Sequence, residues 1–242
     1  MSDILNEKEK RVLEQTGIIH KSFTTSEEDF VGELKDDEVV LQYNVHKYWI
    51  VQDDGTQVVK NLSKTSKDFT PHIDGIDLPV TPRYVALYCV SSGVSDVETY
   101  LIDTKKFLDS LDESEIGILK KLKFVFVDKA GGEYETPVIR YNEDGGYYLH
   151  LTGRGYFKPE YTYNEKYKEN MEFYEYLPVV NKLSAYLGSK ENWDFSLILK
   201  KDDLLVFDNQ RYIHGRCKPQ VEVRDFERRV VRVYFNENIT NK

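Results

Sequence analysis

Short apolar runs separated by polar turns limit most strongly how this chain can fold. They lie at residues 83–90 (RYVALYCV), 124–127, 195–199, 204–207 and 230–235. Their Val, Tyr and Phe content favours strands. Helical segments do not alternate regularly with them, which argues against a doubly wound parallel sheet. The pattern favours a sandwich or barrel of short strands with helices outside it.

Three other segments have helical spacing. A helix is expected over residues 3–16, which carry a weak apolar stripe and stop at Gly17. A second helical segment covers residues 104–121 and can break at Asp112. A third covers residues 164–187, where Pro178 must kink the helix or split it in two. Residues 124–127 and 134–141 around two glycines predict a hairpin, and further strands are expected at 17–21, 38–51 and 99–102. No linker divides the chain, so we expect one domain over residues 1–242.

Charge and cysteine content exclude several classes of protein. The chain has 33 Lys and Arg against 42 Asp and Glu, a net charge of −9. This argues against nucleic acid or an anionic membrane as a partner. Cys89 and Cys217 are too few for a disulfide scaffold or a four-cysteine zinc site, and we expect free thiols. Because neither an apolar leader nor a bilayer-length apolar stretch is present, the sequence predicts a cytoplasmic protein.

Two histidine motifs carry the chemistry. In Thr70-Pro71-His72-Ile73-Asp74-Gly75, the side chains of His72 and Asp74 share a face if the segment is extended. The second motif, FDNQRYIHGR at 207–216, places His214 shortly after an apolar strand. Two histidines and one carboxylate form the facial triad of non-haem Fe(II) oxygenases. A single His-x-Asp is also typical of a surface turn, so its context decides the interpretation.

That context resembles the taurine dioxygenase/clavaminate synthase family of Fe(II)- and 2-oxoglutarate-dependent oxygenases over most of the chain. His214 follows His72 by 142 positions, a normal separation for the family's two histidine ligands. The matching segments are 17–20 (GIIH), 72–75 (HIDG), 93–103, 137–141 (PVIRY) and 208–216, followed by Arg228 and Arg232.

The resemblance implies a role for each residue. His72, Asp74 and His214 would hold the metal. The family's arginine about fourteen positions past the distal histidine binds the C5 carboxylate of 2-oxoglutarate, and Arg228 stands there. Thr99, 27 positions past His72, would help to hold that carboxylate. A guanidinium matches a carboxylate in bidentate fashion, and it stays charged.

Arg232 lies four positions beyond Arg228 and on the same face of a strand. In amino-acid oxygenases of the family a second arginine at this place lies near the substrate carboxylate, so the resemblance implies that Arg232 binds the substrate. Arg229, on the opposite face, is expected at a solvated edge. The remaining histidines, His20, His46 and His150, are expected to be structural, with His150 as the one that could line a pocket. Asn209 and Arg216 could orient His214 or stabilise its turn.

The resemblance further implies a mainly β double-stranded β-helix (jelly roll, cupin-like) with peripheral helices, and Fe(II), 2-oxoglutarate and O₂ as cofactor and co-substrates. The expected reaction is hydroxylation of an unactivated C–H bond, with release of succinate and CO₂. A small amino acid or amino-acid-derived metabolite is the expected substrate, because Arg232 suits its carboxylate and acidic loop residues could meet its amine: Glu98, Asp144 and Glu160.

Four alternatives remain open. The enzyme could be a desaturase or ring-forming oxygenase, or an oxygenase of a sulfonate or other small acid. A jelly-roll metal-binding or sensory protein without turnover would have no reason to keep the pair Arg228 and Thr99. A halogenase would carry a small residue in place of the carboxylate ligand, so Asp74 favours a hydroxylase.

Overall fold

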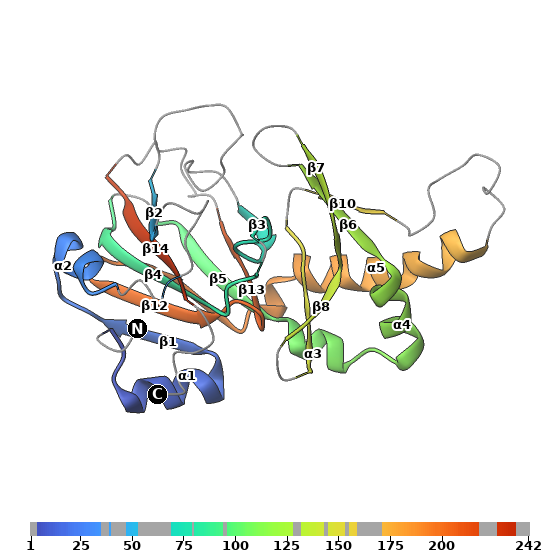
Figure 1. Ribbon diagram of the computed structural model, residues 1–242, viewed down its shortest axis with the longest axis horizontal. Helices are drawn as coiled ribbons and strands as arrows, with labels where there is room; N and C mark the ends of the chain where they lie inside the picture. Colours follow the sequence, from blue (N-terminus) through green and yellow to red (C-terminus); the bar gives the residue numbers. More distant parts are fainter. Residues whose placement is uncertain are drawn as a thin grey trace.

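The computed structural model describes residues 4–34, 39, 47–52, 69–78, 80–93, 96–127, 132–142, 145–152, 155–158, 171–217 and 227–235. Within these ranges, two antiparallel sheets make up the left half of Figure 1. The larger sheet has the strand order β1-β12-β4-β14-β2 and the smaller one β11-β5-β13-β3. Their strands are β1 (Ile18–Ser22), β2 (Tyr48–Val51), β3 (Phe69–His72), β4 (Tyr84–Ser91), β5 (Glu98–Asp103), β11 (Phe195–Ile198), β12 (Asp203–Asp208), β13 (Tyr212–Arg216) and β14 (Arg229–Phe235).

Several successive strands change sheets. β4 lies in the larger sheet and β5 in the smaller, and β11, β12, β13 and β14 alternate between the two in the same way. Each pairing within these sheets is antiparallel. This winding between two facing sheets is that of the predicted jelly roll.

The environment of β12 explains why its sequence is a continuous run of apolar residues. Leu205 and Phe207 face the space between the sheets, where they pack with Leu101 of β5. Leu204 and Val206 point the other way and pack with Leu13 of helix α1 (Glu7–Thr16). Because both faces of the strand are covered, apolar residues do not alternate with polar ones along it.

Helix α1 begins at Glu7, later than the predicted start at residue 3, and it ends where the sequence predicted. Its N-cap Asn6 accepts a hydrogen bond from the backbone N–H of Glu9, whose side chain accepts one from the Asn6 backbone in return. The helix ends at Gly17, which has a left-handed backbone (φ 76°) and a backbone N–H that donates to the Leu13 carbonyl. A glycine takes this conformation without strain. The predicted stop at Gly17 is confirmed.

Most of the elements that form a second apolar cluster lie beside the two sheets, on the right of Figure 1. Here a sheet of order β10-β6-β7 and the pair β8-β9 pack with three helices. The bounds in this part are α3 (Thr104–Asp109), α4 (Glu113–Lys121), β6 (Lys123–Val127), β7 (Glu133–Pro137), β8 (Ile139–Tyr141), β9 (Tyr147–Leu149), β10 (Gly155–Lys158) and α5 (Met171–Gly188). A short helix α2 (Glu27–Gly32) and a 3-10 turn η3 (Lys190–Asn192) complete the described elements.

The helix expectations in this part are mostly met. The break at Asp112 is confirmed, because Asp112 is the N-cap of α4 and accepts from the Glu115 backbone N–H. Helix α5 passes through Pro178 as one element, so the segment does not split there. Burial of the neighbouring Val179 and Leu183 offsets the single lost backbone hydrogen bond. Residues 164–170 of the predicted helix lie outside the described residues.

The predicted second strand of the hairpin, 134–141, is wrong as one element. β6 pairs with β7, but β8 pairs with β9 instead. The interruption falls at Val138, whose N–H donates to the Leu122 carbonyl rather than to a strand neighbour. Of the expected strand 38–51, the described part is β2 and Val39, which forms an isolated bridge with Phe235.

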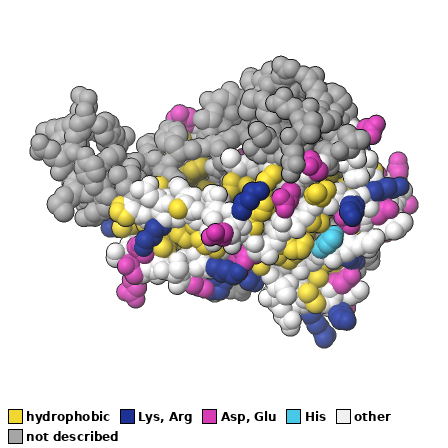
Figure 2. Space-filling view, turned by 180° about the vertical axis from the view of Figure 1, so that it is seen from behind, with side chains coloured by type: hydrophobic (Ala, Val, Ile, Leu, Met, Phe, Trp, Pro, Cys, Tyr) yellow, Lys and Arg dark blue, Asp and Glu magenta, His cyan; other side chains and the backbone are white. Residues whose placement is uncertain are grey.

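The described surface mixes both signs of charge. On the face in Figure 2, basic and acidic side chains are interspersed, and the basic ones do not gather in one area. Among the described residues, no helix is both long and apolar enough to cross a bilayer. Cys89 is buried and Cys217 is half-buried, and these two described residues are not joined in a disulfide.

Candidate metal centre and its cavity

Three predicted metal ligands converge between the two sheets. β13 pairs with β3 so that His214 lies opposite His72, and their ring centroids are 4.2 Å apart. Asp74 follows β3, and its Oδ2 lies 3.4 Å from His214 Nε2. The three residues are buried, and one potential ligand atom from each lies within 4.8 Å of the others.

Hydrogen bonding and burial prepare two of these side chains for a cation. His72 Nδ1 donates to the Thr70 carbonyl (2.8 Å), so the lone pair is on Nε2. Burial and the neighbouring His214 lower the pKa of His72 to about 3, so its imidazole is neutral. Burial opposes ionisation of Asp74, but Arg232 and His214 outweigh it and hold the pKa of this carboxyl below its usual value.

The same pair has atoms that a metal would satisfy. His72 Nε2 and Asp74 Oδ2 are buried and have no hydrogen-bond partner within the described part of the chain. Such orphaned buried atoms are rare unless an ion or water meets them. Two imidazole nitrogens and a carboxylate oxygen form a donor set that suits Fe(II), and it leaves coordination positions open.

Aromatic rings support both imidazoles. Phe69 stacks on His72 with a centroid distance of 3.8 Å and an interplanar angle of 26°. Phe207 packs against His214 at 4.8 Å. These contacts restrict rotation of the two rings, and the sequence analysis did not single out either phenylalanine.

Gly75 explains why a glycine follows Asp74 in the motif. Its φ is +69°, and an added Cβ would lie 2.6 Å from Pro82 Cδ. Other residues rarely adopt this conformation, and none of them would fit against the proline ring. The chain therefore turns sharply after Asp74, and the carboxylate faces the histidines.

The six residues singled out by the sequence line one cavity. Those from the smaller sheet follow its register, in which Thr99 of β5 lies opposite Arg216 of β13. Arg228 and Arg232 approach from the larger sheet. The described residues that line it are Val51, Phe69, His72, Asp74, Leu87, Thr99, His214, Gly215, Arg216, Arg228, Val230 and Arg232.

The cavity carries more positive than negative charge. Among its described lining residues are three arginines, Arg216, Arg228 and Arg232, and one carboxylate, that of Asp74, although the whole chain has a charge of −9. Arg232 Nη1 donates to Asp74 Oδ1 (2.6 Å), so Arg232 contacts a predicted metal ligand directly. Arg229 points away and pairs with Glu27 (2.6 Å), on the opposite face as expected. Such a cavity suits anionic ligands.

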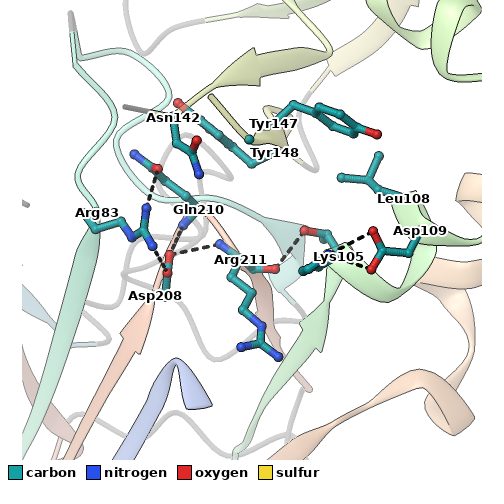
Figure 3. Close-up of a pocket in the computed structure, with 12 residues that line it drawn as sticks. Arg83, Lys105, Leu108, Asp109, Asn142, Tyr147, Tyr148, Asp208, Gln210 and Arg211 are labelled. Atoms are coloured by element: carbon teal, nitrogen blue, oxygen red, sulfur yellow. Dashed lines mark hydrogen bonds and ion pairs between the residues drawn. The ribbon is translucent and has the colours of Figure 1, made fainter. Parts of the chain in front are cut away.

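A second cavity, of about 290 Å³, lies against the turn between β12 and β13 and shares no lining residue with the first (Figure 3). Two ion pairs join charged groups that line it. Arg83 Nη2 lies 2.8 Å from Asp208 Oδ2, and Lys105 pairs with Asp109 on helix α3. Asp208 also accepts from the backbone N–H groups of Gln210 and Arg211, which stabilises the turn that leads to His214.

His150 is fully buried and lines neither cavity. Arg140 donates to the Thr136 hydroxyl (3.1 Å), and this hydroxyl lies 2.8 Å from His150 Nδ1. Burial and the charge of Arg140 lower the pKa of His150 to about 3. The alternative expectation, that His150 lines a pocket, is not met in the described cavities. His20 lies near Asp203, and His46 is outside the described residues.

This buried histidine predicts a loss of stability in acid. Below about pH 6.5 the unfolded chain protonates this residue while the folded chain does not, so its contribution falls as the pH decreases towards 3. The free energy of unfolding of wild type relative to His150→Asn should fall by about 1.4 kcal/mol per pH unit in this range. Urea unfolding of both proteins from pH 7 to pH 4 measures it. A difference that is constant with pH would contradict the assignment of a neutral buried imidazole.

Comparison with known proteins agrees with this geometry. The model of the taurine catabolism dioxygenase TauD, TfdA family matches residues 3–234. No curated protein matches this sequence closely enough to serve as a relative.

Solved structures share the fold. An asparagine oxygenase in complex with Fe(II), 2S,3S-3-hydroxyasparagine and succinate has a TM-score of 0.68 at 13% identity, covering 94% of this chain and 78% of its own. A variant of the non-heme iron oxygenase OrfP with (3S)-hydroxy-L-Arg has a TM-score of 0.66 at 12% identity, with 95% and 78% covered. A taurine dioxygenase from Burkholderia xenovorans has a TM-score of 0.61 at 13% identity, with 94% and 80% covered.

The structural matches confirm the predicted jelly roll, and the family match confirms the predicted enzyme class, a dioxygenase. With nearly the whole sequence matched, the chain belongs to the taurine catabolism dioxygenase TauD, TfdA family.

Proposed function

We propose that this chain is an Fe(II)- and 2-oxoglutarate-dependent dioxygenase that hydroxylates a small amino acid or amino-acid-derived metabolite and acts as one domain. The observation that carries the proposal is the cavity in which two histidines and a carboxylate lie beside three arginines. The histidines and the carboxylate suit a divalent metal. The arginines suit two anionic ligands, 2-oxoglutarate and a substrate with a carboxylate.

His72, Asp74 and His214 would hold Fe(II). Bound there, the metal would supply the activation of O₂ for attack on an unactivated C–H bond, coupled to conversion of 2-oxoglutarate to succinate and CO₂. The neutral His72 offers its Nε2 without first losing a proton, and the carboxylate of Asp74 is ionised. Arg232 donates to Oδ1 of Asp74, which leaves Oδ2, on the side of His214, as the oxygen that would hold the metal.

Arg228 and Thr99 would hold the distal carboxylate of 2-oxoglutarate. Both line the cavity, and they approach from opposite sheets. Arg228 is only 8% exposed, so its interaction with an anion is poorly screened by water. A guanidinium offers two parallel N–H donors, and a threonine hydroxyl adds a third.

Arg232 would bind the carboxylate of the substrate beside the metal. Its place in the same cavity supports this role, and its bond to Asp74 gives it a second task, to orient the metal ligand. Of the acidic residues predicted to meet an amine, Glu98 lies on β5, while Asp144 and Glu160 are outside the described residues.

An amino acid is the favoured substrate because two similar structures hold hydroxylated amino acids, 3-hydroxyasparagine and hydroxyarginine. A sulfonate or another small acid is the second candidate, supported by the likeness to a taurine dioxygenase. We also propose a cytoplasmic location, which agrees with two cysteines that are not joined in a disulfide.

The test measures succinate release from 2-oxoglutarate in the presence of Fe(II), O₂ and each free amino acid in turn, then small organic acids and sulfonates. We expect one or a few amino acids to raise succinate release well above the rate without substrate, and Asp74→Ala to abolish the increase. A visible charge-transfer band with Fe(II) and 2-oxoglutarate without O₂ tests the site separately. A protein with neither the band nor succinate release would be a jelly-roll binding protein instead.

A further inference from the structure

Asn209 is a fully buried carboxamide at the turn between β12 and β13. The turn carries the chain from the larger sheet to the smaller one, and His214 lies five residues further on. Fully buried asparagines are uncommon, and their polar atoms need partners. The partners of Asn209 lie far away in the sequence, in the segment that carries Asp74.

The Asn209 side chain hydrogen-bonds to both backbone groups of Asp74, its N–H and its carbonyl. Its Oδ1 accepts from the Asp74 backbone N–H (2.9 Å), and its Nδ2 donates to the Asp74 carbonyl (3.0 Å). The same Nδ2 donates to the Pro82 carbonyl (3.0 Å), and the backbone N–H of Asn209 donates to the Arg83 carbonyl (2.8 Å). The carboxamide therefore bonds to Asp74 as a neighbouring strand would.

This arrangement requires an asparagine. A backbone N–H meets Oδ1 and two carbonyls meet Nδ2, so the opposite orientation of the amide would place donor against donor and acceptor against acceptor. An aspartate has the same shape but lacks the two N–H donors, and a shorter side chain leaves three buried backbone groups without partners. Gly75 turns the chain directly after Asp74, so β3 itself does not continue to hold this residue.

We infer that Asn209 is a positioning residue of the metal centre: it fixes the backbone of Asp74 relative to the strand that carries His214. The inference rests on the proposed metal site. Asp74 and His214 come from segments 140 positions apart, and Asn209 joins these segments beside the metal cavity. Loss of the Asn209 carboxamide should let the Asp74 carboxylate move away from the histidines. His72 and His214 should stay opposite each other, because the pairing of β3 with β13 holds them.

The experiment measures Co(II) binding, because Co(II) takes similar ligands and its visible spectrum reports their number and geometry. Wild type, Asn209→Ala and Asn209→Ser are titrated without O₂, well below the melting temperature of each protein. The serine variant keeps a hydroxyl donor and room for water, so it remains measurable if the alanine variant does not fold. Leu13→Ala, which removes a buried side chain of α1 far from the cavity, is the control for lost stability.

We expect the dissociation constant for Co(II) to rise by roughly 10- to 100-fold in Asn209→Ala, with a smaller rise in Asn209→Ser and an altered visible spectrum in both. Leu13→Ala should melt at a lower temperature but keep the affinity and spectrum of wild type. The inference is overturned if the folded Asn209 variants bind Co(II) as wild type does. Absence of Co(II) and Fe(II) binding in wild type would instead overturn the proposed metal site itself.

Discussion

His72→Ala is expected to abolish stoichiometric Fe(II) binding. The variant removes a neutral imidazole whose unpartnered Nε2 faces Asp74 and His214, and two ligands do not complete a facial triad. Anaerobic titration of Fe(II) against the purified variant measures the effect, and His214→Ala should behave in the same way.

The control is His20→Ala, which removes an imidazole from β1 outside the cavity. This variant should bind Fe(II) as wild type does. If His72→Ala or His214→Ala also binds iron with unchanged affinity, the three ligands are assigned wrongly, whatever the activity of the variant.

Arg228→Ala is expected to raise the apparent 2-oxoglutarate constant by roughly ten- to several-hundredfold. Loss of a charged hydrogen bond in a buried site costs about 1.5–3 kcal/mol, and leaving the ligand carboxylate unpaired costs more. The iron affinity should stay near normal because the guanidinium that bonds to Asp74 belongs to Arg232, which this variant keeps. Titration of 2-oxoglutarate into the Fe(II) protein without O₂, followed by the visible band, measures the constant.

Arg232→Ala provides the contrast. The variant should bind the substrate more weakly. Its iron affinity should also fall, because the guanidinium that it lacks bonds to Asp74 in the wild type. Binding of 2-oxoglutarate should be retained. The two arginines are close and can couple, so the contrast is more informative than either value. If Arg232→Ala loses 2-oxoglutarate while Arg228→Ala keeps it, the two roles are exchanged.

The sequence predicted the jelly roll through the resemblance of its motifs to a known family, and the same resemblance named the candidate site residues. The two histidine motifs and the two arginines, spaced along the sequence as in the family, line one cavity in the structure. Nothing in the local sequence around His72 or His214, 142 positions apart, predicts that they are in contact. The contact itself depends on the pairing of β13 with β3, a long-range register that only the folded sheet defines.

Residues that support the ligands were harder to predict. Phe69 lies three positions before His72, and in a regular strand such residues face opposite sides, so its stacking on the imidazole has no signal in the pattern. Asn209 was recognised as a neighbour of the distal motif, but its bonds to Asp74 span 135 positions. The path of α5 through Pro178 likewise depends on tertiary packing, which outweighs the local effect of proline.

The division of the cavity between two sheets has a consequence for how the protein opens. The histidines and Thr99 belong to the smaller sheet, whereas the two predicted anion-binding arginines lie on or directly before β14 of the larger one. A ligand that contacts both sets binds only while the sheets are packed together, so its binding should raise the free energy of sub-global opening of the sandwich. Slower amide exchange in β13 and β14 with the ligand bound would measure this stabilisation.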